Sequence, residues 1–147
     1  MRLPRIVVLL GYAGLLPFVI GPLWVTAAPA SAPLWLDDAW TGYVTLLAAF
    51  LAGTFWGFAL SAIEGPNGVL GVFIASALLL LTWVTMVVAP GYQLPLLALV
   101  FLLQLLADYW RERTLDTIPG YFRLRATLTV GAIAAIAWRL LLPTGGL

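Results

Sequence analysis

The longest uncharged run in the chain covers residues 65–107, a stretch of 43 residues. A helix needs about 20 predominantly apolar residues to cross the hydrocarbon core of a bilayer. The run is therefore long enough for two crossings, and turn-forming residues near its middle, at 89–95, mark where two helices meet. It predicts two transmembrane helices joined by a tight turn.

The composition of the whole chain agrees with a membrane protein. Of the 147 residues, 63% are hydrophobic and 9% are charged, against roughly 25% charged residues in soluble domains. So few charges cannot cover the surface of a water-soluble fold. The sequence predicts one all-α domain over residues 1–147, an integral membrane bundle of five transmembrane helices. The expected spans are residues 6–26, 40–63, 69–89, 94–110 and 126–142.

The arginines predict the orientation of the bundle. If successive helices alternate in direction, six of the seven arginines lie on one side: Arg2, Arg5, Arg111, Arg113, Arg123 and Arg125. Because basic residues stay in the cytoplasm, we expect a cytoplasmic N-terminus and a C-terminus outside. The absence of lysine in a chain rich in alanine, leucine and arginine favours a bacterial source. The expected location is therefore the bacterial inner membrane.

Arg139 is the seventh arginine and falls near the outer end of the last span. Its long side chain can reach outward to the interface and meet Asp37 or Asp38 there. Such an extension explains the residue, and no functional role is assigned to it.

The N-terminal segment has a second interpretation. Arg2 and Arg5, an apolar stretch and then residues 30–32 resemble a cleavable signal peptide. The apolar stretch is longer than the usual core of about 7–15 residues, and it contains Pro17 and Pro22. We expect a permanent first span.

Missing residue types exclude several chemistries. The chain has no cysteine, histidine or lysine, so disulfides, thiolate or imidazole ligands and Schiff-base lysines are excluded. No phosphate-binding glycine loop or pair of catalytic carboxylates is evident. We expect no catalytic site, no metal and no cofactor. The net charge of +1 argues against nucleic acid, which requires a broad basic surface.

A stripe of small residues follows the second span at four-residue spacing: Ala49, Gly53, Gly57 and Ser61. Such a small-residue ridge lets a neighbouring helix approach closely. The favoured interpretation is packing inside the bundle, and the alternative is a docking surface for another protein.

Polar residues are expected to gather at the cytoplasmic mouth of the bundle. Gln104 and Asp108 are four residues apart and share a face of the fourth helix. The other members of the predicted cluster are Glu64, Arg123 and Arg125. The favoured interpretation is an ion pair between Asp108 and Arg123 or Arg125. The alternative is a proton or ion site on Asp108 or Glu64, since intramembrane ionisable residues are often functional.

Four segments carry a resemblance to a known family: residues 10–18, 50–57, 103–108 and 121–129. The chain resembles small five-span membrane proteins of unknown function, with bacterial members and a mitochondrial branch that includes transmembrane protein 69. The resemblance implies a five-span inner-membrane protein but supplies no activity. The residues that match its motifs are Pro17, Gly53, Trp56, Gly57, Gln104, Asp108, Arg123 and Arg125.

One position departs from this resemblance. Members often carry a histidine just before the tryptophan of the second span, where this chain has Phe55. A metal or proton function that depends on that histidine would be missing here, which favours a structural role.

The first functional hypothesis is a non-enzymatic accessory or assembly subunit of a larger membrane complex, respiratory or photosynthetic. Its expected partners are the lipid bilayer and either another membrane protein or further copies of this chain. The alternative is a small transporter or carrier of protons, ions or a lipophilic molecule such as a quinone, using Asp108 or Glu64. A lipid-modifying enzyme with one of these carboxylates as its base is a third, weaker hypothesis.

Overall fold

The computed structural model describes residues 4–114 and 120–142, and within these ranges the chain is helical and forms no strand. The elements in chain order are α1 (Arg5–Ala13), α2 (Leu16–Ala27), the short 3-10 helix η1 (Pro29–Ser31), α3 (Leu36–Ser61), α4 (Pro66–Val87), α5 (Pro90–Thr114) and α6 (Tyr121–Leu141). The predicted all-α fold is confirmed.

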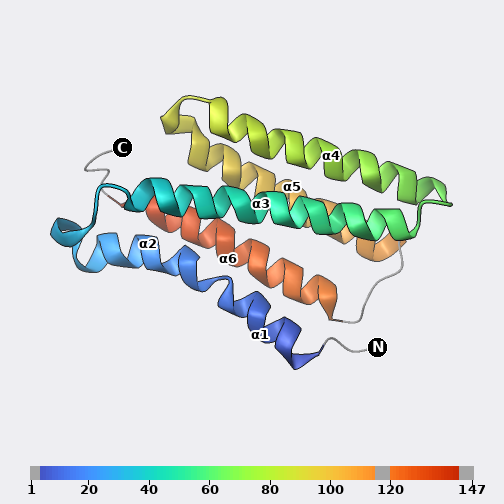
Figure 1. The fold of residues 1–147 in the computed structure, drawn as a ribbon, viewed down its shortest axis with the longest axis horizontal. Coiled ribbons are helices and arrows are strands. Elements are labelled where there is room, and N and C mark those ends of the chain that lie inside the picture. Colours follow the sequence, from blue (N-terminus) through green and yellow to red (C-terminus); the bar gives the residue numbers. More distant parts are fainter. Residues whose placement is uncertain (1–3, 115–119, 143–147) are drawn as a thin grey trace.

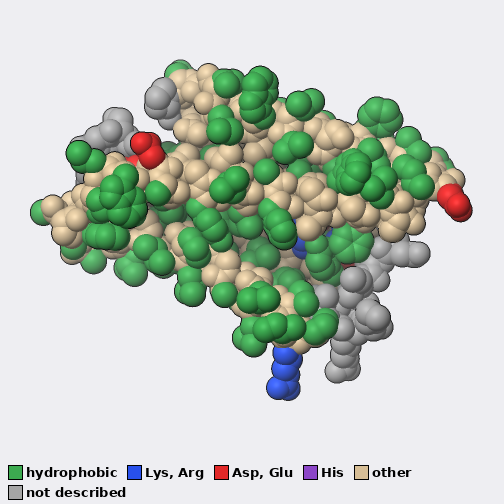
Figure 2. All heavy atoms as spheres, viewed as in Figure 1, with side chains coloured by type: hydrophobic (Ala, Val, Ile, Leu, Met, Phe, Trp, Pro, Cys, Tyr) green, Lys and Arg blue, Asp and Glu red, His purple; other side chains and the backbone are tan. Residues whose placement is uncertain are grey.

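Five helical segments are long and apolar enough to cross a membrane, as the sequence predicts. The first consists of α1 and α2 together, and α3, α4, α5 and α6 are the others. In Figure 1, α3 runs through the middle of the bundle; it contacts α4 and α5 on one side and α2 on the other. Figure 2 shows hydrophobic side chains along the whole visible face, with acidic side chains near its two ends. This surface is suited to lipid.

Three helices begin four or five residues earlier than the sequence patterns suggested. The second span begins at Leu36 rather than residue 40, and places Asp37 and Asp38 in its first turn. Carboxylates there interact favourably with the helix dipole. The fourth span begins at Pro90 instead of residue 94, because the first helical position needs no backbone N–H and suits proline. The fifth begins at Tyr121, after Gly120 with a positive φ of 84°.

The C-terminal end of α5 also differs from the expectation. The helix continues to Thr114, beyond the predicted end at residue 110, with Arg111 and Arg113 in its last turn. Cations are favourable at a helix C-terminus, where the dipole is negative. The extension matters because it places Arg111 inside the bundle.

The first span is broken between α1 and α2, at the bend visible in Figure 1. Pro17 lacks an N–H, and its ring clashes with the carbonyl group four residues earlier, so a helix cannot continue unchanged through it. The chain passes through a tight turn there, in which the Leu15 N–H donates to the Tyr12 carbonyl at 3.0 Å. The hydroxyl of Tyr43 on α3 donates to the Gly14 carbonyl at 2.6 Å, which satisfies a polar group at the break.

Close packing of α2 against α3 and α5 depends on aromatic rings. Phe18 of α2 is fully buried, with its ring edge toward Tyr43 and Phe101. Trp40 is also buried, and a Cβ at Gly21 would lie 2.6 Å from its indole. Only glycine therefore allows α2 to lie this close to α3.

Candidate functional site

The small-residue ridge on α3, formed by Ala49, Gly53, Gly57 and Ser61, lies largely on the outside of the bundle. Gly53, Gly57 and Ser61 are exposed and Ala49 is half-buried. A Cβ built on Gly53 or Gly57 would meet nothing within 4 Å. The favoured expectation of packing inside the bundle is therefore wrong for these two glycines, because α3 turns this face away from its neighbours within the described chain.

A different set of small residues makes the close contact between α3 and α4. A Cβ on Gly71 of α4 would lie 2.8 Å from the Cβ of Ala59, and one on Gly68 would overlap the Ala62 carbonyl. Glycine is needed on α4, where the two backbones approach, rather than on the ridge of α3.

Two grooves flank the ridge. The first, of about 200 Å³, lies between α3 and α4 and is lined by Ala49, Ala52, Gly53, Trp56, Ala75, Ser76 and Leu79. The second, of about 440 Å³, lies between α3 and α6 and is lined by Thr54, Gly57, Phe58, Ser61 and Tyr121. The ridge is thus an open strip on the face that the bundle presents to the membrane.

Three charged residues are buried together where α5 ends and α6 begins. Asp108, Arg111 and Arg125 each expose no more than 2% of their surface. The Nε of Arg125 donates to Oδ2 of Asp108 at 3.0 Å, and the Nε of Arg111 lies 3.6 Å from Oδ1. We call these three residues the buried charge cluster. It contains two positive charges and one negative charge.

Arg125 joins three helices through its guanidinium group. Besides Asp108 of α5, it donates to the Leu51 carbonyl of α3 at 3.1 Å and to the hydroxyl of Thr54. A longer contact of 3.4 Å reaches the hydroxyl of Tyr121, one turn earlier on α6. The predicted ion pair between Asp108 and Arg125 is present, and it fixes α6 against α3 and α5.

Arg111 lacks comparable partners. Its side chain is fully buried, and among the described residues no acceptor lies within hydrogen-bonding geometry of Nε, Nη1 or Nη2. The guanidinium carbon lies 4.8 Å from the centre of the Phe58 ring and 5.2 Å from that of Tyr121. These cation–π contacts provide part of the stabilisation that hydrogen bonds would give.

Gln104 lies one turn from Asp108 on α5 and is also fully buried. Its Nε2 donates to the Ala48 carbonyl of α3 at 3.2 Å, and its Oε1 has no partner among the described residues. The side chain links α5 to α3 and extends the polar layer one turn deeper into the span.

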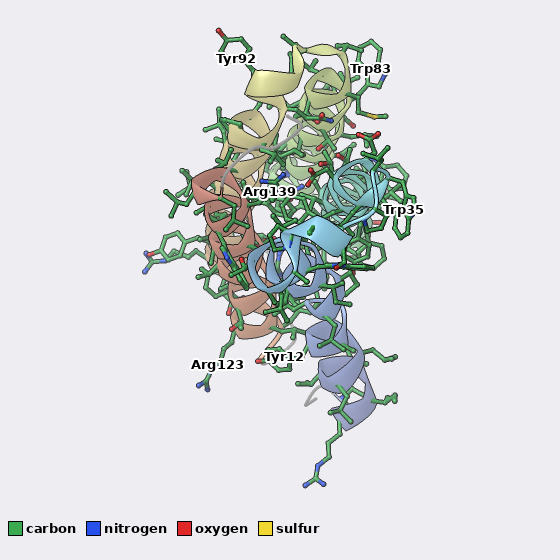
Figure 3. All side chains as sticks on the ribbon, turned by 90° about the vertical axis from the view of Figure 1, so that its left-hand side faces the viewer. Tyr12, Trp35, Trp83, Tyr92, Arg123 and Arg139 are labelled. Atoms are coloured by element: carbon green, nitrogen blue, oxygen red, sulfur yellow. The ribbon has the colours of Figure 1, made fainter. Side chains whose placement is uncertain are left out.

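Two members of the predicted polar cluster lie elsewhere. Glu64 is exposed in the turn between α3 and α4, where it lines a shallow hollow with Asn67 and Thr114. Arg123 is exposed on α6 and points away from the bundle in Figure 3. The prediction that Glu64 and Arg123 join Asp108 is wrong. Glu64 lies in the turn, and Arg123 lies on a different face of α6 from Arg125, the residue that does reach Asp108.

Arg111 is the residue that sequence reasoning missed. The predicted fourth span ends at residue 110, which leaves Arg111 just outside it. Its position three residues after Asp108 would place both on one helix face, so continuing the helix by one turn would have identified it.

A second ion pair lies toward the opposite end of the bundle. Arg139 of α6 exposes only 3% of its surface, and its Nε and Nη2 donate to Asp37 of α3 at 2.8 and 2.7 Å. Figure 3 shows Arg139 directed into the space between helices. The expected contact with one of the two aspartates at this end of the bundle is confirmed. Of the two candidate partners, Asp37 is the one engaged, and Asp38 is exposed.

Three remaining predicted features are placed as follows. Pro17 lies near the start of α2, just after the break. Trp56 is partly exposed and lines the α3–α4 groove. Within residues 4–114 and 120–142, no three histidine, cysteine, aspartate or glutamate side chains are close enough to hold a metal.

Comparison with known proteins gives one result at the level of family. Residues 3–141 match the family described as "Protein of unknown function (DUF3429)". No curated protein and no solved structure shows a significant match to the chain. The matched segment covers all five candidate spans, including the buried charge cluster and the ridge on α3. The chain is therefore a member of this family of proteins of unknown function, and its five apolar helices indicate a multi-pass membrane protein.

Proposed function

We propose that this protein is a non-enzymatic accessory or assembly subunit that docks a transmembrane helix of a different membrane protein against the ridge on α3. The observation that carries the proposal is the open space over Gly53 and Gly57. In a bilayer, small residues at a helix surface allow close backbone approach, which strengthens van der Waals packing between helices.

The dimensions of the ridge favour a helix as the occupant. From Ala49 to Ser61 it extends over roughly 18 Å at 1.5 Å per residue, more than half of a hydrocarbon core of about 30 Å. The groove beside it toward α4 adds the small side chains of Ala75 and Ser76. A strip of this length and smoothness fits a helix that crosses the membrane alongside α3.

The surroundings of the carboxylates give less support to a carrier of protons or ions. Asp108 is held by Arg125 and faces Arg111, so its charge already has partners. Glu64 is exposed at a loop, away from the interior of the bundle. A carrier or an enzyme would require a carboxylate free to exchange protons or to act as a base.

The test is to purify the tagged protein from its native membranes in a mild detergent and quantify the membrane protein that accompanies it. The variants Gly53→Leu and Gly57→Leu place a large side chain on the ridge. The matched control is Gly42→Leu, at another α3 glycine whose Cβ would meet nothing within 4 Å. All variants are first compared with the wild type for thermal unfolding in detergent.

The proposal expects one stoichiometric partner. Its recovery should fall about tenfold or more in the ridge variants, equivalent to roughly 1.4 kcal/mol of binding free energy. Its recovery with the control variant should be unchanged. A partner retained equally by all variants would contradict docking on the ridge. Recovery of the protein only as a homo-oligomer would contradict the accessory role.

A further inference from the structure

The buried charge cluster does not balance its own charge. Arg111 and Arg125 supply two positive charges, Asp108 supplies one negative charge, and all three are almost fully buried. Oδ2 of Asp108 lies 3.0 Å from the Nε of Arg125, whereas Oδ1 lies 3.6 Å from the Nε of Arg111. A buried guanidinium without hydrogen-bond partners is costly, so the cluster favours one additional anion.

Arg111 has the capacity to bind such an anion. None of its three side-chain nitrogens has an acceptor among the described residues. A guanidinium donates hydrogen bonds in a fixed planar fork that matches the oxygens of a phosphate group. One phosphate would therefore balance the excess positive charge of the cluster and accept hydrogen bonds from these nitrogens.

A groove that faces the membrane lies beside this guanidinium. Phe58 and Tyr121, whose rings flank Arg111, also line the open groove of about 440 Å³ between α3 and α6. Figure 2 shows a small area of basic side chain between these two helices, within an otherwise apolar face. The hydroxyl groups of Thr54 and Tyr121 lie along the groove and contact Arg125. Neither arginine is among the residues that line the groove, so the rings of Phe58 and Tyr121 must part for a phosphate to reach Arg111.

The depth of the cluster identifies the source of the phosphate. Arg111 lies three residues before the end of α5, and Arg125 lies four residues after the start of α6. At 1.5 Å per residue these are distances of only about 5–6 Å from the helix ends. Helices of this length place their ends in the headgroup layer of the bilayer. A phosphate at this level belongs to a phospholipid.

We propose that the groove between α3 and α6 binds the headgroup phosphate of an anionic phospholipid, with Arg111 as its charged anchor. Thr54 and Tyr121 line the entrance, and an acyl chain lies over the apolar surface of α3. Basic pockets between transmembrane helices are known to bind lipid head groups in this way. The site goes beyond helix docking, although Gly57 and Ser61 border both surfaces.

The test measures thermal unfolding of the purified full chain in neutral detergent micelles that contain increasing amounts of phosphatidylglycerol. Phosphatidylcholine in parallel micelles tests the need for net negative charge, and inorganic phosphate tests a free anion. The critical variant is Arg111→Met, which keeps an unbranched side chain and removes the charge. Arg123→Met is the matched control, because Arg123 is an exposed arginine at the same end of α6.

Phosphatidylglycerol is expected to raise the unfolding midpoint of the wild type and of Arg123→Met, with little effect of the other two additives. In Arg111→Met the apparent affinity is expected to fall on the order of tenfold to a hundredfold, as for the loss of a charge-assisted contact. Without lipid, Arg111→Met is expected to unfold no earlier than the wild type, since the removed guanidinium is buried and its donors have no acceptor among the described residues.

Three outcomes of the unfolding experiment would overturn the proposal. Equal loss in Arg111→Met and Arg123→Met would indicate general surface attraction. Equal stabilisation by inorganic phosphate would assign the site to a free anion. Lower stability of Arg111→Met in every condition, with an unchanged lipid response, would make Arg111 a purely structural residue. Native mass spectrometry of the wild type provides a test that needs no variant. If the protein does not retain phosphatidylglycerol in preference to phosphatidylcholine, the proposal is also contradicted.

Discussion

The indole of Trp40 donates a hydrogen bond of 3.0 Å to the carbonyl oxygen of Phe18, 22 residues earlier in the chain. In an uninterrupted helix this carbonyl would accept from the residue four positions later, which is Pro22 and has no N–H. A side chain of α3 therefore completes the hydrogen bonding of α2. Proline is tolerated inside a membrane span where a neighbouring helix can satisfy the freed backbone group in this way.

This relationship predicts the effect of Trp40→Phe. The substitution keeps an aromatic ring but leaves the buried Phe18 carbonyl without a donor. We expect the free energy of unfolding to fall by about 1–3 kcal/mol, the usual cost of an unsatisfied buried polar group. Thermal or denaturant unfolding in micelles measures it. The control is Trp83→Phe, at an exposed tryptophan. If Trp83→Phe lowered the free energy of unfolding as much as Trp40→Phe, loss of the hydrogen bond would not be the cause.

The ion pair of Asp108 predicts a strong effect of Asp108→Asn. The change leaves Arg111 and Arg125 with no counter-charge among the described residues. Breaking a buried pair from one side typically costs about 3–5 kcal/mol. Glu64→Gln, at an exposed carboxylate, is expected to change stability by less than about 0.5 kcal/mol.

A double-mutant cycle separates this pair from other effects. Adding Arg125→Gln to Asp108→Asn removes both partners, and the combined loss of stability is expected to be smaller than the sum of the single losses. Strict additivity of the two unfolding free energies would show that the residues do not act as a pair.

The glycines of α3 and α4 are expected to respond in opposite ways to alanine. In Gly71→Ala the new methyl group would lie 2.8 Å from the Cβ of Ala59, and such overpacking costs about 1–3 kcal/mol. In Gly53→Ala the methyl group meets open space, and helix propensity alone favours alanine by up to about 1 kcal/mol. Unfolding midpoints of the two variants in detergent test the assignment. Equal destabilisation would place Gly53 in a close contact within the chain.

The proposed orientation can be tested with single cysteines, because the natural chain has none. Ser31→Cys lies in the connection between α2 and α3, and Glu64→Cys lies in the turn between α3 and α4; both native side chains are exposed. If the N-terminus is cytoplasmic, a membrane-impermeant thiol reagent added to intact cells labels position 31 but not position 64. The reverse pattern would invert the bundle. Labelling of both after solubilisation confirms that each thiol is reactive.

The sequence alone predicted the number of spans and most of their extent. This was possible because the requirement to fill the hydrocarbon core is local: each segment must be apolar over about 20 residues whatever surrounds it. An ion pair between Asp108 and an arginine on the last helix followed in the same way, since isolated charges at this depth are costly. Helix ends were less predictable, as shown by α5, which continues through Arg111.

Only the tertiary structure decided which faces of the helices meet. A membrane helix is apolar on its lipid side as well as on its buried side, so its hydrophobic pattern does not reveal how it is rotated about its own axis. That rotation turns Gly53 and Gly57 outward, brings Arg125 rather than Arg123 to Asp108, and places Arg111 between Phe58 and Tyr121. Contacts between residues far apart in the chain determine it, and the ridge and the buried charge cluster both depend on them.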